Sequence, residues 1–228
     1  MTTQPQIVFI HGFLGVPEDW TEYVDYFKQL GYETKALELE ECELGQIHKS
    51  VNPGAHLVGY SMGGRVALLF SSLKPDFFSS LTLISTNPGL LSKEEREHRS
   101  EWEEEWLSKM ERMPIDEFVH EWYSQSLFCS FRPPARRYRQ NKDSMIKTFR
   151  KFSIANLPSL WDHLLRIPCR VQMIFGRLDG KYMNIKRKIE EIDTEKRIAL
   201  KTISNRSHSL HLEASHQILR QIGNFIRK

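Results

Sequence analysis

The chain has 228 residues, of which 40% are hydrophobic and 27% charged, and it carries a formal net charge of +3. This length suffices for one compact domain with a buried core, and so small a positive charge argues against a nucleic-acid partner. The three cysteines, Cys42, Cys129 and Cys169, are scattered, which argues against a disulfide framework or a zinc site and favours a reducing compartment.

The first residues carry no targeting signal. Residues 1–6 lack a basic region followed by a long apolar one, and no part of the chain approaches the roughly 18 consecutive apolar residues of a membrane helix. We therefore expect a cytoplasmic protein without a membrane span.

Strand and helix patterns alternate along the chain. Short apolar runs predict strands at 7–10, 33–39, 56–59, 81–84, 171–175 and 198–203. Apolar residues at helical spacing predict helices at 17–30, 65–70, 185–192 and 212–226. Because strands alternate with helices and no hairpin signal occurs, we expect an α/β fold with a mostly parallel sheet and helices on both faces.

One stretch, residues 89–160, interrupts this alternation. It contains no convincing strand, but helical patterns occur at 93–110, 115–126 and 143–152. We interpret it as a helical cap inserted between two strands of a single domain that spans residues 1–228.

The strongest chemical signal is the pattern G-x-S-x-G at residues 59–63, between a predicted strand and a predicted helix. In this context the pattern is typical of the nucleophile elbow of the α/β-hydrolase fold, in which a sharp turn presents a serine hydroxyl and needs glycines at both sides. Ser61 is therefore the candidate nucleophile or base. In this fold two backbone N–H groups form the oxyanion hole, and their positions correspond to Phe13 and Met62.

A catalytic serine needs an imidazole, and the imidazole needs a carboxylate that orients it. In this fold the acid and then the histidine follow the serine along the chain. Asp179 follows a predicted strand, and both His208 and His211 follow the last one. We favour His208 because it lies nearer to the end of that strand, and we assign His11 a role in ordering its own turn.

Arginines form a second constellation. Arg65 directly follows the elbow, the cap contains Arg96 and Arg99, and residues 132–151 carry eight basic side chains against one acidic one. Arginine's planar fork suits carboxylates, so the pattern favours a substrate with several negative charges. A solvated basic helix face is the alternative for the arginines of the cap.

The chain resembles a known family within the α/β-hydrolases, the 2-succinyl-6-hydroxy-2,4-cyclohexadiene-1-carboxylate synthases of menaquinone biosynthesis. The resemblance spans most of the chain and is carried by HGFLG at 11–15, EDW at 18–20, GYSMGGR at 59–65, STNPGL at 85–90, EER at 94–96 with Arg99, WY at 122–123, LF at 127–128 and PSLW at 158–161. The elbow is shared by the whole superfamily, whereas Arg65, Pro88-Gly89 and Trp122-Tyr123 are more selective.

The resemblance implies a lyase that eliminates pyruvate from 2-succinyl-5-enolpyruvyl-6-hydroxy-3-cyclohexene-1-carboxylate. Ser61 would act as the base that removes a ring proton, with His208 and Asp179 behind it, and no acyl-enzyme would form.

The resemblance also implies which residues bind the substrate. Arg65, Arg99 and a third arginine of the cap would hold its carboxylates. When the family pattern is aligned backwards from Pro158 without gaps, the third arginine is Arg137, and a small shift of the alignment would make it Arg139. Trp122 and Tyr123 would line the pocket, or they belong to an ordinary apolar helix face.

Two departures from the family pattern bear on the substrate. Ser207 stands where the family usually has a glycine before the catalytic histidine. The segment after Leu39 lacks the usual Asp-x-Pro-Gly-His-Gly loop and full helix, so one wall of the pocket is expected to differ.

The leading hypothesis is therefore the pyruvate-eliminating lyase acting on a small polycarboxylate. A serine carboxylesterase or C–C bond hydrolase of the same fold is the runner-up, and a catalytically silent binding protein is a third reading. No P-loop, dinucleotide or zinc-protease motif occurs, so we expect no cofactor and no metal. We expect a monomer or a small homo-oligomer.

Overall fold

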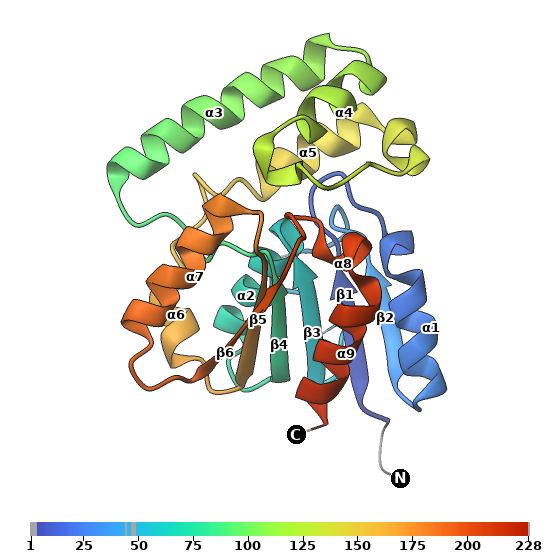
Figure 1. Ribbon diagram of the computed structural model, residues 1–228, viewed down its shortest axis with the longest axis vertical. Coiled ribbons are helices and arrows are strands. Elements are labelled where there is room, and N and C mark those ends of the chain that lie inside the picture. The colour runs from blue at the N-terminus through green and yellow to red at the C-terminus, as the bar shows by residue number, and fades with distance from the viewer. Residues whose placement is uncertain (1–3, 44, 47–48, 228) are drawn as a thin grey trace.

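The computed structural model describes residues 4–43, 45–46 and 49–227. Its centre is a sheet of six parallel strands in the order β2-β1-β3-β4-β5-β6 (Figure 1). The strands are β1 (Gln6–Ile10), β2 (Glu33–Leu37), β3 (Ala55–Tyr60), β4 (Phe78–Ile84), β5 (Arg170–Gly176) and β6 (Ile198–Ile203). The predicted α/β-hydrolase fold with a parallel sheet is confirmed.

Helices cover both faces of this sheet. Ile7 and Phe9 of β1 belong to the apolar cluster that packs under α1 (Thr21–Gln29) and α9 (Ser215–Ile226). Val8 and Ile10 belong to the opposite cluster, with α2 (Met62–Leu73), α6 (Trp161–Arg166) and α7 (Gly180–Ile192). Because successive side chains of a strand point to opposite faces and both faces are covered, the central strands β1, β3, β4 and β5 are buried along almost their whole length.

The segment between β4 and β5 is helical. It contains α3 (Lys93–Arg112), α4 (Ile115–Tyr123), the 3-10 helices η3 (Ser126–Phe128) and η4 (Ala135–Arg139), and α5 (Lys142–Lys151). These helices lie beyond the carboxyl ends of the strands (Figure 1). We call residues 89–160 the cap; its status as an insertion in a single domain stays a prediction.

Two of the predicted helices are each divided into two shorter helices in the structure. The C-terminal helix is broken at Ala214 (φ −144°, ψ 40°) into α8 (Leu210–Glu213) and α9. The break leaves the Glu213 carboxylate free to turn back and accept the N–H groups of Ser207 and Ser209. A short 3-10 helix, η1 (Pro17–Trp20), precedes α1, where the sequence predicts one continuous helix.

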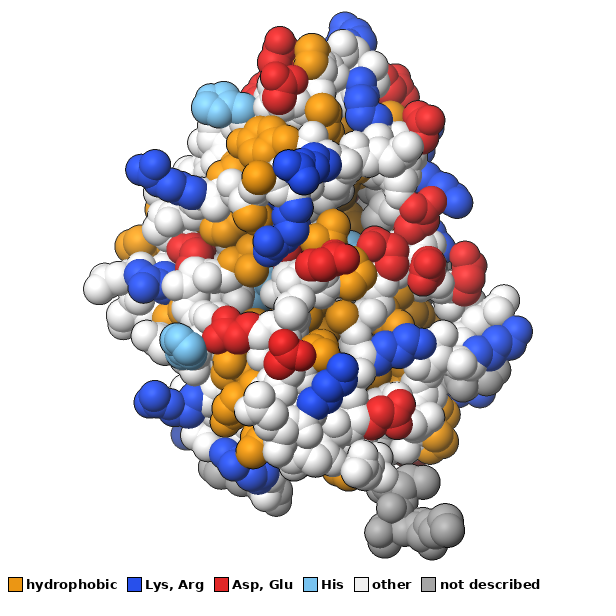
Figure 2. All heavy atoms as spheres, turned by 90° about the vertical axis from the view of Figure 1, so that its right-hand side faces the viewer, with side chains coloured by type: hydrophobic (Ala, Val, Ile, Leu, Met, Phe, Trp, Pro, Cys, Tyr) orange, Lys and Arg blue, Asp and Glu red, His pale blue; other side chains and the backbone are white. Residues whose placement is uncertain are grey.

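The surface is mixed in charge. On the side of the molecule where α1 lies, acidic and basic side chains are interspersed (Figure 2). Among the helices of residues 4–43, 45–46 and 49–227, none has the length and apolar character needed to cross a membrane.

The approach of α2 to the loop after β4 generates the first prediction. A Cβ on Gly64 would lie 1.9 Å from the hydroxyl oxygen of Thr86, whereas a Cβ on Gly180 would meet nothing within 4 Å. We expect Gly64→Ala to lower the free energy of unfolding by about 1 to 3 kcal/mol through overpacking. Gly180→Ala, the matched control, should leave it unchanged or raise it by up to about 1 kcal/mol.

Urea unfolding of both variants measures these values. Adding Thr86→Ala removes the hydroxyl that the new methyl group would meet and should recover most of the loss in the Gly64→Ala protein. Equal stability of Gly64→Ala and Gly180→Ala would contradict this account of the packing.

Candidate active site

Ser61 occupies a strained turn between β3 and α2. Its backbone has φ 52° and ψ −111°, a conformation that residues other than glycine rarely adopt. The Ser61 N–H donates to the carbonyl oxygen of Ile84 (2.9 Å), which ties the turn to β4. A Cβ at Gly63 would lie 2.3 Å from the carbonyl oxygen of His11, so only glycine allows α2 to start this close to the end of β1. The geometry is that of a nucleophile elbow.

The structure brings together the three residues predicted as a triad. Nε2 of His208 lies 3.0 Å from the Ser61 hydroxyl oxygen, and Nδ1 of His208 lies 2.6 Å from Oδ2 of Asp179. Asp179 is fully buried and His208 is 2% exposed. A buried carboxylate can only accept, so it orients Nδ1 as the donor and leaves Nε2 free to take the serine proton.

Hydrogen bonds from neighbouring residues hold Asp179 and His208 in place. The second oxygen of Asp179 accepts the N–H of Tyr182, so this carboxylate also caps α7. The His208 N–H donates to the carbonyl of Leu127 in the cap (3.0 Å), and the His208 carbonyl accepts the hydroxyl of Ser85 (2.8 Å). The histidine is therefore positioned jointly by the sheet and by the cap.

His211, the alternative histidine, lies elsewhere. Its ring is buried against the ring of Tyr60, with centroids 4.0 Å apart, and its Nε2 is 3.9 Å from a carboxylate oxygen of Asp19. Burial lowers the pKa of His211, which keeps its ring neutral although Asp19 acts in the opposite direction. The geometry favours His208 as the partner of Ser61.

The two residues whose amides are predicted to form the oxyanion hole line the same cavity as Ser61. Phe13 and Met62 both line this cavity, which has a volume of about 70 Å³ and which we call the inner cavity. Within the described part of the chain, neither backbone N–H donates a hydrogen bond to another group. Both amides are therefore free to stabilise negative charge on a bound oxygen, and their role as an oxyanion hole stays a prediction.

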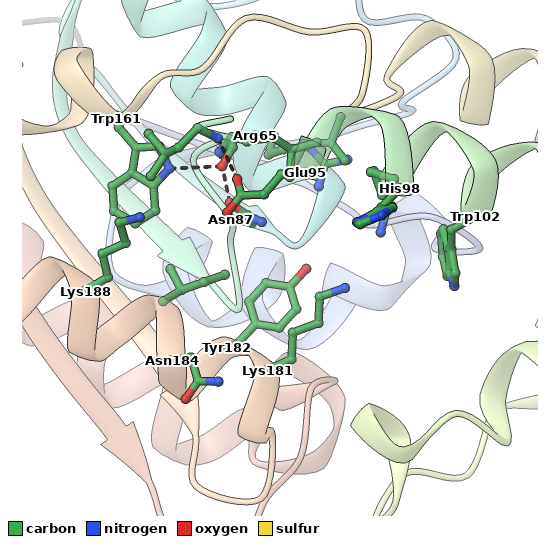
Figure 3. Close-up of a pocket in the computed structure, with 16 residues that line it drawn as sticks. Arg65, Asn87, Glu95, His98, Trp102, Trp161, Lys181, Tyr182, Asn184 and Lys188 are labelled. Carbon is green, nitrogen blue, oxygen red and sulfur yellow. Dashed lines mark hydrogen bonds between the residues drawn. The ribbon is translucent and has the colours of Figure 1, made fainter. Parts of the chain in front are cut away.

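A larger cavity of about 500 Å³ adjoins the inner one, between α3 and α7 (Figure 3). We call it the outer cavity. Five residues line both cavities: Arg65, Arg99, Trp102, Lys181 and Tyr182. Space large enough for a small-molecule substrate therefore lies next to the cavity that contains Ser61 and His208.

The two arginines predicted near the elbow both face this space. Arg65 is buried and donates to the carbonyl of Phe152 (3.2 Å), while its Nε has no partner among the described residues. Burial lowers the pKa of Arg65 to about 10, so it remains charged at neutral pH. Nε of Arg99 lies 2.8 Å from Glu103, and its guanidinium stacks over the ring of Trp102.

Lys181 is a cavity residue that the sequence analysis missed. It lies in the first turn of α7, two residues after Asp179, and no acidic residue accompanies it in that turn. A cation is unfavourable at a helix N-terminus, and this is the signal that could have revealed an anion site. Desolvation lowers the pKa of Lys181, and the charges of Arg99 and Arg65 lower it further.

The predicted third arginine does not reach either cavity. Arg137 is 2% exposed, and its Nη2 lies 2.5 Å from Oδ2 of Asp19. Tyr123 receives a hydrogen bond from Nε of Arg137 (3.2 Å), and neither residue lines the inner or the outer cavity, whereas Trp122 lines the inner one. Counting along the sequence did not reveal that Asp19 already binds Arg137.

Arg139, the other candidate, is exposed and lines a third cavity of about 320 Å³ beside α5. Glu38, Leu39 and Glu40 of the shortened segment also line this third cavity. Described residues of that segment line neither of the cavities at the triad, so the expected change in a pocket wall falls on the third cavity. Residues 44, 47 and 48 lie outside the described part.

The serine before His208 has its own structural role. The Ser207 hydroxyl donates to the carboxylate of Glu213 (2.7 Å), which also accepts the Ser207 N–H (3.2 Å). A serine in place of the family's usual glycine therefore stabilises the turn that carries the histidine.

Comparison with known proteins places the chain among enzymes of this fold. The sequence model of the "Alpha/beta hydrolase family" matches residues 7–221. A Photorhabdus laumondii protein named 2-succinyl-6-hydroxy-2,4-cyclohexadiene-1-carboxylate synthase is 24% identical over 91% of this chain and 80% of its own. The similarity to that family, expected from the motifs, is confirmed.

Solved structures agree on the fold. MenH from S. aureus superposes with a TM-score of 0.86 at 24% identity, over 100% of this chain and 95% of that one. An esterase from Thermogutta terrifontis superposes with a TM-score of 0.75 at 17% identity, over 99% and 90%.

The triad geometry predicts that a serine-directed fluorophosphonate modifies Ser61. We expect no modification in Ser61→Ala, and a rate about 10²- to 10⁴-fold lower in Asp179→Asn, because the amide would orient His208 in the wrong tautomer. Intact-mass spectrometry follows the reaction. Modification at another serine, or an unchanged rate in Asp179→Asn, would contradict the assignment.

Proposed function

The chain belongs to the alpha/beta hydrolase family, and we propose that within this family it is a lyase that eliminates pyruvate from 2-succinyl-5-enolpyruvyl-6-hydroxy-3-cyclohexene-1-carboxylate. The observation that carries the proposal is the presence of three cationic side chains, Arg65, Arg99 and Lys181, in the cavities that adjoin Ser61. The named relative supports the choice of reaction.

The charge of the cavities suits this substrate. The substrate carries three carboxylates: one on the ring, one on the succinyl chain and one on the enolpyruvyl group. Arg99 is partly neutralised by Glu103, whereas Arg65 and Lys181 form no ion pair within the described part of the chain. A neutral ester would leave these cations without counter-charge in a partly desolvated space, which is costly.

Volume points the same way. The inner cavity, at about 70 Å³, holds only the reacting part of such a molecule. The outer cavity, at about 500 Å³, is large enough for the rest, and its lining combines Trp102, Trp161 and Ile185 with the cations. Figure 3 shows Trp102 and Trp161 in the lining with Arg65 and Lys181. The substrate would therefore span both cavities, with its carboxylates near their shared boundary.

The names of substrate and product define the step. A proton leaves ring carbon 2, the ring double bond moves from carbons 3 and 4 to carbons 4 and 5, a new one forms between carbons 2 and 3, and the carbon–oxygen bond at carbon 5 breaks. His208 would take the Ser61 proton while Ser61 takes the ring proton, with Asp179 stabilising the imidazolium. The departing pyruvate enolate would regain a proton from His208.

The oxyanion hole would assist the same step. Removing the proton beside the succinyl carbonyl places negative charge on that carbonyl oxygen. The free N–H groups of Phe13 and Met62 would stabilise this enolate, as they would stabilise a tetrahedral intermediate in a hydrolase. This use of the triad needs no covalent intermediate.

A serine carboxylesterase or C–C bond hydrolase remains the second candidate. The hydrogen-bonded triad and the two free amides are also what acyl transfer requires. The intact triad argues against a silent binding protein, because a scaffold gains nothing from a strained serine. Cytoplasmic location, oligomeric state and the absence of a cofactor stay predictions.

A pyruvate-coupled assay with the cyclohexene substrate tests the proposal. We expect the wild-type protein to release one pyruvate per substrate, and Ser61→Ala to lose about 10³- to 10⁴-fold in kcat/KM because the base is removed. Rapid turnover of small esters with no release of pyruvate would overturn the lyase in favour of the hydrolase. Activity unchanged in Ser61→Ala would rule out Ser61 as the base, whereas no turnover of either kind of substrate by the wild-type protein would favour a binding protein.

Lys181 makes the binding of substrate dependent on pH. Its pKa lies below the ordinary lysine value, so it loses its charge as the pH rises through that lowered value, and the affinity for an anion should fall. We expect KM to rise with pH in this range. Lys181→Ala should have a KM about 10-fold higher while the wild-type lysine is charged, because a charged hydrogen bond is lost, and this difference should shrink as the pH rises through the lowered pKa.

Lys181→Arg is the matched control because arginine keeps its charge up to a much higher pH. Its KM should remain flat where that of the wild-type protein rises. A KM that depends on pH equally in Lys181→Arg and in the wild-type protein would assign the titration to another group.

A further inference from the structure

The strongest feature outside the triad is a buried ion-pair cluster at Asp19. This carboxylate belongs to η1 and is 4% exposed as a residue, with its side chain fully covered. Nε of Arg136 lies 2.7 Å from Oδ1, and Nη2 of Arg137 lies 2.5 Å from Oδ2. Burial alone would raise the pKa of Asp19, but His211 and Arg137 outweigh it and hold the carboxylate ionised.

The cluster joins the cap to the loop that carries Phe13. Both arginines belong to η4 of the cap, whereas Asp19 follows the loop of residues 11–16. The same Asp19 oxygen that binds Arg137 also accepts the N–H of Val16 (3.2 Å). Next to η4, the side-chain amide of Gln140 donates to the carbonyl of Leu14 (2.6 Å). The loop is thus linked to the cap directly at Leu14 and, through Asp19, at Val16.

Arg137 also extends toward the cavity wall. Its Nε donates to the Tyr123 hydroxyl, and Trp122, the preceding residue, packs edge-on against the ring of Phe13 with centroids 4.8 Å apart. The carbonyl oxygen of Leu127, four residues after Tyr123 in the cap, accepts the N–H of His208. One segment of the cap therefore touches the predicted oxyanion loop and the catalytic histidine, and Arg137 anchors it.

A direct contact of Arg137 with substrate is incompatible with this arrangement. To reach the inner cavity the guanidinium would have to leave Asp19, which would then be a buried anion paired with the partly exposed Arg136 and no longer with a buried arginine. Removing one partner of a buried ion pair is strongly unfavourable.

We propose that Arg137 is a positioning residue: by holding Asp19 it fixes the loop that presents the Phe13 amide and the cap segment that braces His208. The inference rests on the proposed function for its kinetic consequence but not for its structural one. It predicts a change in kcat rather than in substrate affinity, because Arg137 acts on the reacting groups through other residues.

Kinetics of Arg137→Ala test the first consequence. We expect kcat for pyruvate release to fall about 10- to 100-fold while KM stays within about threefold. Arg137→Lys keeps the charge but not the planar guanidinium, so its kcat should lie between those of the wild-type protein and Arg137→Ala. Arg136→Ala is the matched control, since Arg136 binds the same carboxylate from the surface, and it should change kcat by less than about threefold.

A double variant guards against loss of folding. Asp19→Asn with Arg137→Met removes both charges, so neither is left buried and unpaired, and it should show the same fall in kcat. A raised KM with unchanged kcat would instead make Arg137 a substrate ligand. Unchanged kcat and KM would reduce it to a structural contact, and either result overturns the proposal.

Nuclear magnetic resonance separates this proposal from the proposed function because it needs no substrate. The ¹⁵N signals of the Phe13 amide and the His208 imidazole should shift in Arg137→Ala and not in Arg136→Ala. If the wild-type protein releases no pyruvate, the proposed reaction fails, yet these signals still decide whether Arg137 positions the two groups. Identical spectra in all three proteins would overturn it.

Discussion

The hydrogen bond between His208 and the buried carboxylate of Asp179 is the interaction on which the rest of this molecule depends. The two residues follow different strands, β5 and β6, and lie 29 positions apart. They meet because the carboxyl ends of parallel strands share one edge of the sheet. Burying a carboxylate is costly unless it accepts hydrogen bonds, and Asp179 accepts them from the His208 imidazole and the Tyr182 N–H.

Charge is distributed around this pair in two ways. Arg65 and Lys181 line the two cavities, where a bound anion could neutralise their positive charge. On the far side of the Phe13 loop, Arg137 is neutralised by Asp19 within the protein. Arginine is therefore proposed to bind substrate in one place, whereas in the other it pairs with a carboxylate of the chain itself, and the difference is whether such a carboxylate is within reach.

Residues of the cap contact the triad histidine and the loop that carries Phe13. Its Leu127 carbonyl accepts the His208 N–H, its Trp122 packs on Phe13, and its Glu103 holds Arg99. The Asp19 cluster is a further buried contact between the cap and the sheet domain. The inner cavity beside Ser61 is small, and the larger outer cavity lies between α3 and α7.

Local signals were enough to predict the parallel sheet, the elbow at Ser61 and the positions of Asp179 and His208. Each of these follows from neighbours a few residues away: a strand that ends, a glycine that permits close approach, a polar side chain just beyond. Local signals could not show which arginine of the cap lies in a cavity. The helices of the cap are joined by loops of irregular length, so the distance between two residues along the sequence does not give their positions in space. Only the tertiary structure decided that Arg137 pairs with Asp19, 118 residues away, and that Lys181 lies in the cavity. A buried charge is placed by whichever opposite charge the fold brings near it, and that partner is remote in the sequence.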